Sequence, residues 1–168
     1  MSLGIAIFTF LHVALSLVGI AAGFVVVFGL ISSKQLDKWT TLFFATTVAT
    51  SLTGFLFPFH KLLPSHVIGL VSLVALTIAF LARYARRLTR AWRWVYAVNV
   101  VTALYLNVFV LVAQAFLKVP VLKAMAPTQS EPPFLVAQLV VMALFVVLGI
   151  FAVRRFHAEP VHGAVAFD

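Results

Sequence analysis

The chain has 168 residues, of which 64% are hydrophobic and only 10% are charged. This composition excludes a soluble globular protein, because the surface of such a protein needs far more polar side chains. Its net charge of +8 comes from 12 Lys and Arg residues against 4 Asp and Glu residues. With so little soluble sequence, this excess indicates orientation in a membrane rather than binding of nucleic acid.

Five apolar runs follow one another along the chain, and each is long enough for a helix to cross the hydrocarbon core of a bilayer. No Lys or Arg precedes the first run, which also exceeds the apolar part of a signal peptide, so we expect it to remain as a helix. The fold class is therefore an all-α integral membrane protein, with one transmembrane domain over residues 1–168. The predicted spanning helices cover residues 3–31, 39–57, 65–82, 94–117 and 134–153, and a short tail covers residues 154–168.

The basic residues predict which side of the membrane each loop occupies. Five spans place the link 32–38, the link 83–93 and the tail on one side, and these segments carry nine of the basic residues. The corner 57–69 and the loop 118–133 lie on the other side and carry three. Because short cytoplasmic loops are enriched in Lys and Arg, we expect the N-terminus outside and the C-terminus in the cytoplasm of a bacterial cell, in a multi-pass inner-membrane protein.

Small and polar residues mark the faces on which membrane helices pack. Gly19 and Gly23 lie one turn apart in the first predicted helix and would allow another backbone to approach closely. The fifth predicted helix has few such residues beyond Gln138 and Gly149. We therefore expect the first four helices to form a four-helix bundle, with the fifth as a peripheral helix.

Strongly polar residues gather in the outer half of the predicted spans, when depth is counted at 1.5 Å per helical residue. Such a cluster predicts a polar pocket for a quinone or another apolar molecule with a polar head. The alternative for Tyr105, Asn107 and Gln114 is interhelical hydrogen bonding, worth about 0.6 kcal/mol per contact. The candidate ligand-binding residues are His12, His60, His66, Tyr105, Asn107, Gln114 and Gln138.

The histidines allow a second interpretation, a b-type haem that transfers electrons. Neutral imidazole is a haem-iron ligand, and His12 and His66 could serve if they lie on different helices at one depth. Otherwise His12 hydrogen-bonds a neighbouring helix through Thr or Asn, while His60 and His66 are solvated at the membrane surface. No two histidines have the i, i+4 spacing that would support a zinc site on a helix, and the absence of cysteine excludes thiolate ligands.

The arginine-rich link is expected to bind anionic lipid headgroups at the cytoplasmic face, at about 1 kcal/mol per residue. No Asp or Glu lies within a predicted span, so no intramembrane carboxylate is available for a proton relay or for acid–base catalysis. These features predict a non-enzymatic accessory or ligand-binding component, whose partner would be another membrane protein or a second copy of itself. The arginines of the link 83–93 that are expected to bind headgroups are Arg83, Arg86, Arg87, Arg90 and Arg93.

A resemblance is carried by the segment Ala103-Leu104-Tyr105-Leu106-Asn107, with Gln114, Lys118 and Ala126-Pro127 after it. With these residues the chain resembles uncharacterised small bacterial inner-membrane proteins, a resemblance that implies a location and no activity. In its number of predicted spans it is also similar to the tryptophan-rich sensory (translocator) proteins, which bind porphyrins. Their tryptophan-rich motifs are missing here, so this likeness is one of architecture alone.

Overall fold

The computed structural model describes residues 3–57 and 64–157, and all regular structure in these ranges is helical. The fold-class prediction of an all-α protein is therefore confirmed for the described residues. His60 lies outside them. The helices are α1 (Leu3–Ile31), α2 (Asp37–Gly54), α3 (Pro64–Phe80), α4 (Trp92–Lys118), α5 (Pro120–Met125) and α6 (Pro132–Arg155), and a π-helical turn at Leu81–Ala85 continues α3.

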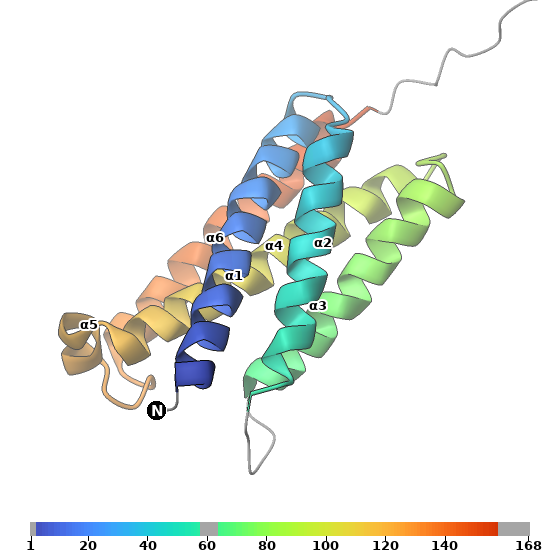
Figure 1. Ribbon diagram of the computed structural model, residues 1–168. Helices are drawn as coiled ribbons and strands as arrows, with labels where there is room; N and C mark the ends of the chain where they lie inside the picture. Colours follow the sequence, from blue (N-terminus) through green and yellow to red (C-terminus); the bar gives the residue numbers. More distant parts are fainter. Residues whose placement is uncertain (1–2, 58–63, 158–168) are drawn as a thin grey trace, which may run out of the picture.

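Four segments of the described chain are long and apolar enough to cross a membrane: α1, residues His66–Ala85, α4 and α6. Such a set is typical of a multi-pass membrane protein. The second helix does not reach the same apolarity, because its 18 residues include six threonines, Asp37 and Lys38. It is nevertheless a continuous helix between α1 and α3 (Figure 1).

Several helix boundaries differ from the predicted ones. The third helix does not stop at residue 82, since the π-helical turn carries it to Ala85 and places Arg83 on the helix rather than in a link. Past this turn, Arg87 and Leu88 adopt φ angles of 47° and 55°, and the Leu88 amide donates to the Ala82 carbonyl at 3.0 Å. Left-handed residues with a long backward hydrogen bond are a common way of closing a helix. In the predicted loop 118–133, the short helix α5 begins at Pro120, whose fixed φ suits the first helical position.

Helix α4 is the central element of the bundle. It packs against α3, α6 and α1, while α1 also packs along α2, and α2 along α3. The long helices run alternately in opposite directions, so α1, α3 and α6 share one direction (Figure 1). One end of the bundle, here called the arginine end, holds the link 32–36 and residues 86–91, and the opposite end, here called the corner end, holds α5 and the start of α6.

Glycine allows α1 to approach α2 and α4 closely, as the spacing of Gly19 and Gly23 predicted. A Cβ atom at Gly23 would lie 2.6 Å from Cδ1 of Leu104 and 2.8 Å from Cε2 of Phe43. Both of these side chains are fully buried, so neither has free space into which it could move. The absence of a side chain at Gly23 therefore sets the distance between the three helices.

Candidate functional site

His12 forms a hydrogen bond between α1 and α2. Its Nδ1 atom lies 2.8 Å from Oγ1 of Thr53, and that hydroxyl donates to the Ala49 carbonyl at 2.7 Å. The tautomer of the His12 ring decides which of the two atoms is the donor in this bond. The ring also packs edge-on against Phe57, at 5.1 Å between centroids. This is the interhelical role that was the alternative to ligand binding.

His66 lies on the other side of the end of α2. Its side chain is buried, and its ring packs against that of Phe55 with 5.4 Å between centroids. His66 is thus not solvated, contrary to the alternative considered for it. Helix α2 packs against both α1 and α3, and the two histidines contact residues at its end from these different helices, His12 through Thr53 and His66 through Phe55.

The polar residues predicted on α4 point in different directions. Asn107 donates from Nδ2 to Oγ1 of Thr47 on α2, at 3.2 Å. Tyr105 faces α6, where its ring lies 5.7 Å from that of Phe145, and Gln114 is exposed. Residues 105 and 107 are separated by about 200° around a helix, so they cannot line one pocket from the same face. The structure therefore does not bring Tyr105, Asn107 and Gln114 together.

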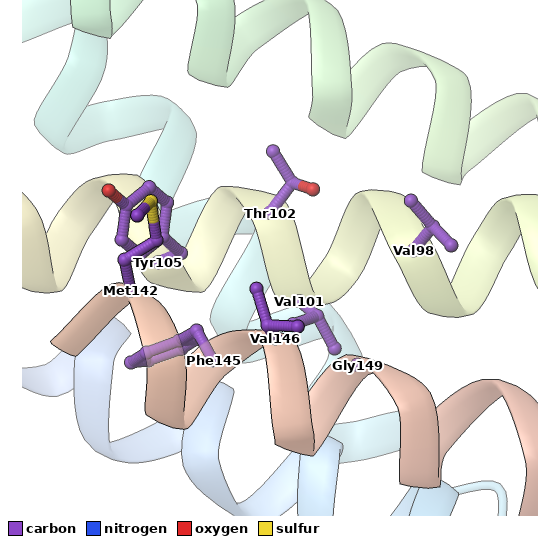
Figure 2. Close-up of a pocket in the computed structure, with 8 residues that line it drawn as sticks. All are labelled: Val98, Val101, Thr102, Tyr105, Met142, Phe145, Val146 and Gly149. Carbon is purple, nitrogen blue, oxygen red and sulfur yellow. The ribbon is translucent and has the colours of Figure 1, made fainter. Parts of the chain in front are cut away.

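A groove of about 220 Å³ lies between α4 and α6 (Figure 2). Among the described residues that line it, only Thr102 and Tyr105 have polar side chains, and Gly149 leaves part of the α6 surface without a side chain. The lining residues are Val98, Val101, Thr102, Tyr105, Met142, Phe145, Val146 and Gly149. Of these, only Tyr105 was predicted from the sequence to bind a ligand. The groove depends on a gap between two packed helices, and the pattern of apolar residues along a single helix does not reveal such a gap.

Gln138 lies on α6, one turn from Met142 in the direction of the corner end. Its Nε2 atom donates to the backbone carbonyl of Phe109 at 3.1 Å, which connects α6 to α4. Its side chain is only 8% exposed, and its Oε1 atom is buried without a hydrogen-bond partner among residues 3–57 and 64–157. A carbonyl can only accept, so the orientation of the Gln138 amide is fixed by Phe109.

At the corner end, the chain before α6 is organised by Glu131. Its carboxylate accepts hydrogen bonds from the Thr128 amide at 3.1 Å, the Thr128 hydroxyl at 2.8 Å and the Ser130 amide at 3.1 Å. Loss of hydration acts to raise the pKa of Glu131, but these hydrogen bonds outweigh it, so its pKa lies below the ordinary value. They fix the turn from which α6 starts.

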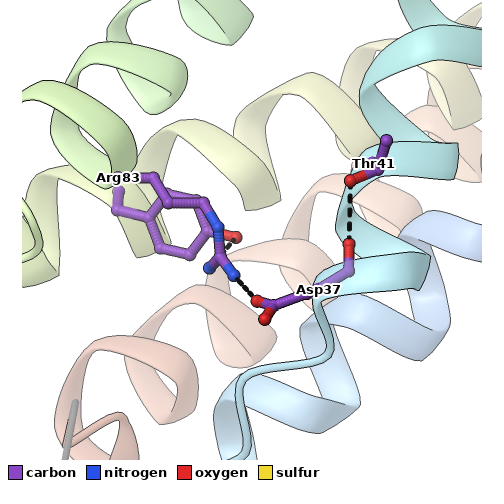
Figure 3. A network of polar contacts seen from close by, with 4 residues as sticks. Asp37, Thr41 and Arg83 are labelled. Atoms are coloured by element: carbon purple, nitrogen blue, oxygen red, sulfur yellow. Dashed lines mark hydrogen bonds and ion pairs between the residues drawn. The ribbon is translucent and has the colours of Figure 1, made fainter. Parts of the chain in front are cut away.

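Arg83 joins three helices at the arginine end (Figure 3). Its Nη2 atom forms an ion pair with Asp37 at the start of α2, and its Nη1 atom donates to the Tyr96 hydroxyl on α4 at 3.3 Å. The guanidinium also lies over the Tyr96 ring, 5.4 Å from its centroid. The Arg83 side chain is only 7% exposed, whereas that of Asp37 is 81% exposed.

This arrangement separates Arg83 from the other arginines that were predicted to bind lipid headgroups. Arg86, Arg87 and Arg90 are exposed, and the Arg86 guanidinium lies 5.0 Å from the ring centroid of Trp92. Arg93 is half-buried. The prediction of headgroup binding therefore stays open for the exposed arginines, while Arg83 has partners within the bundle.

Within residues 3–57 and 64–157, no group of three or more His, Cys, Asp or Glu side chains could hold a metal ion. No protein-family model, no curated protein and no solved structure matches the chain. The fold and the groove are accordingly described by this chain's own residues alone.

Proposed function

We propose that the chain is a non-catalytic accessory protein of the bacterial inner membrane that crosses the bilayer five times and binds an apolar molecule between α4 and α6. The observation that carries the binding proposal is the groove lined by Thr102, Tyr105 and apolar side chains. Ligand sites are mostly apolar, with few polar groups that orient the ligand. The volume of the groove is below the usual range of about 300–1,000 Å³, so it suits one end of a ligand whose remainder lies in lipid.

The fifth crossing in this proposal is α2. Helices α1 and α3 run in the same direction (Figure 1), so a chain that crosses the bilayer in both has to return between them. Helix α2 has 18 residues, about 27 Å at 1.5 Å per residue, close to the thickness of a hydrocarbon core. Its hydroxyls are compatible with lipid where they bond to carbonyls of their own helix, as those of Thr46 and Thr53 do at 2.7 Å.

The proposed orientation has the N-terminus outside and the arginine end in the cytoplasm. Support comes from the segments that meet at that end: the Ser33 hydroxyl donates to the Arg155 carbonyl at 2.6 Å, and Asp37 pairs with Arg83. These contacts connect the three segments that carry most of the basic residues, and cytoplasmic loops are enriched in such residues. In this orientation the exposed Arg86 and Arg90 would bind anionic lipid headgroups.

Single cysteines test the orientation cleanly, because the natural chain has none. Lys34→Cys and Ala124→Cys both replace exposed residues, one at each end of the bundle. In intact cells with a permeabilised outer membrane, an impermeant thiol reagent should label Cys at position 124 and should label position 34 only after lysis. The opposite pattern, or equal labelling of both positions in intact cells, would reject the proposed topology.

A matched pair of variants tests binding in the groove. Val146 lines the groove and Val147 does not, yet both are exposed on α6. Val146→Trp should fill the groove and remove a small molecule that co-purifies with the wild type in native mass spectrometry, whereas Val147→Trp should retain it. If the wild type carries no small molecule, or if Val146→Trp keeps it, the binding proposal fails.

The b-type haem with His12 and His66 as ligands is the weaker candidate. His12 is already hydrogen-bonded to Thr53, and the ring of His66 packs against that of Phe55, so each histidine has a partner within the bundle. A Soret band in the purified protein that disappears in both His12→Ala and His66→Ala would nevertheless establish it.

A further inference from the structure

Helix α5 turns away from the direction of α4 at the corner end (Figure 1). Helix α4 ends at Lys118 and α5 begins at Pro120. Val119, between them, is extended, with φ −84° and ψ 117°. A proline disfavours the helical conformation of the residue before it, so Pro120 accounts for the break. Helix α5 therefore does not prolong α4 along its axis.

Contacts within the chain hold α5 against the end of α4. On the side of α4, the Val119 amide donates to the Ala115 carbonyl at 2.9 Å. Directly after α5, Ala126 is fully buried. The Nε2 atom of Gln129 then donates to the carbonyl of Ala113 on α4, at 2.7 Å. Because α5 is fixed on both sides, its faces have set directions relative to the bundle.

The two faces of α5 differ in polarity. Val121 and Met125 lie one turn apart on the same face, and they are 70% and 52% exposed. Lys123 is two residues from each of them, about 200° around the helix, so it lies on the opposite face. No residue of α5 is buried. The apolar face of α5 is thus uncovered by the described part of the chain.

The length of α4 places α5 at a membrane surface. Helix α4 has 27 residues, or about 40 Å at 1.5 Å per residue, which matches the thickness of a whole bilayer with its headgroups, about 40–45 Å. Trp94 in its first turn is 50% exposed, and tryptophan is enriched at membrane interfaces. With Trp94 at one interface, Lys118 reaches the other. The apolar face of α5 therefore follows directly on lipid-facing side chains of α4 such as Leu117, which is 44% exposed.

We propose that α5 is an interfacial helix that binds the boundary between the headgroups and the acyl chains of the leaflet at the corner end. Val121 and Met125 insert among the acyl chains, and Lys123 stays at the level of the phosphates. Interfacial helices have this division into an apolar face and a basic face. The reverse placement would expose two large apolar side chains to water and bring an ammonium group into hydrocarbon. The inference rests on the proposed crossing of the bilayer by α4, and not on the groove.

Spin labels test this placement on the full chain, in nanodiscs that each hold one copy. The natural chain has no cysteine, so Val121→Cys, Met125→Cys and Lys123→Cys each carry a single label. Val147→Cys, on the exposed surface of α6, is the reference for lipid, and Lys34→Cys is the reference for water. Molecular oxygen should relax the labels at 121 and 125 as it does at 147, and a water-soluble nickel complex should not reach them. The label at 123 should respond to the nickel complex as the label at 34 does.

The outcomes separate this inference from the proposal on which it rests. If the nickel complex reaches positions 121 and 125 as well as 123, α5 lies in water and the inference is overturned. If both reagents are excluded from 121 and 125 in native membrane vesicles, a protein covers this face in place of lipid, which also overturns it. In both cases an oxygen response at 147 leaves the proposed membrane crossing intact. A nickel response at 147 would instead reject the crossing together with the inference.

Discussion

Substitution of Gly23 by alanine should destabilise the bundle. Two effects oppose each other at this position. Alanine favours a helix over glycine by up to about 1 kcal/mol. Its Cβ atom would, however, lie 2.6 Å from Leu104 and 2.8 Å from Phe43, whereas carbon atoms normally approach only to about 3.5–4.0 Å. Both neighbours are fully buried, so relief requires the helices to separate.

Overpacking of this kind costs about 1–3 kcal/mol, so we expect Gly23→Ala to lower the free energy of unfolding by about 1–2 kcal/mol after the gain in helix propensity. Gly149→Ala is the control, since its Cβ atom would meet only Val101, at an ordinary 3.6 Å. That variant should be neutral or more stable by up to about 1 kcal/mol. Reversible SDS unfolding in mixed micelles, followed by tryptophan fluorescence, measures both changes. A Gly23→Ala protein as stable as Gly149→Ala would refute this account of helix packing.

Three other predictions concern polar side chains and use the same unfolding measurement. Asp37→Asn should cost up to about 3 kcal/mol because it leaves the buried guanidinium without a counter-ion, whereas Arg83→Met leaves Asp37 in water and should cost less; equal losses would contradict this asymmetry. Ser72→Ala should raise stability by about 1 kcal/mol, because the Ser72 hydroxyl is buried and has no hydrogen-bond partner within the described chain, and a loss of stability would mean that the hydroxyl is bonded. Because the folded pKa of Glu131 is lowered, its stabilising effect should be complete above the unfolded pKa and vanish as the pH falls through the folded value. Glu131→Gln should remove that pH dependence, and an unchanged acid profile would show that the hydrogen bonds from Thr128 contribute nothing.

The positions of the long helices could be predicted because the length of an apolar run is a property of the sequence itself. The run 3–31 is a good example, since α1 has these bounds. The extent of the third helix could not be predicted in this way. Its continuation past residue 82 depends on the hydrogen bond from the Leu88 amide to the Ala82 carbonyl and on burial of the Leu88 side chain. That continuation places Arg83 inside the bundle, whereas the sequence predicted that it lies in a link that binds lipid headgroups.

The candidate site was predictable only in part. The separation of Tyr105 from Asn107 follows from helical geometry, so the sequence already held the reason why they do not share a pocket. The contact of Asn107 with Thr47 required the relative depth of two helices, which composition does not give. The buried acceptor of Gln138 depends on which half of its amide meets Phe109, and only the packed structure decides that.

The central place of α4 has a consequence for biogenesis. When only α1 to α3 of a nascent chain have emerged from the ribosome, three contacts with α4 are still missing. They are those of Gly23 with Leu104, of Thr47 with Asn107 and of Arg83 with Tyr96. These groups gain their neighbours when α4 inserts, so commitment to the folded state should come late in synthesis. A chain truncated before Trp92 is therefore expected to be a substrate for the proteases that survey the membrane.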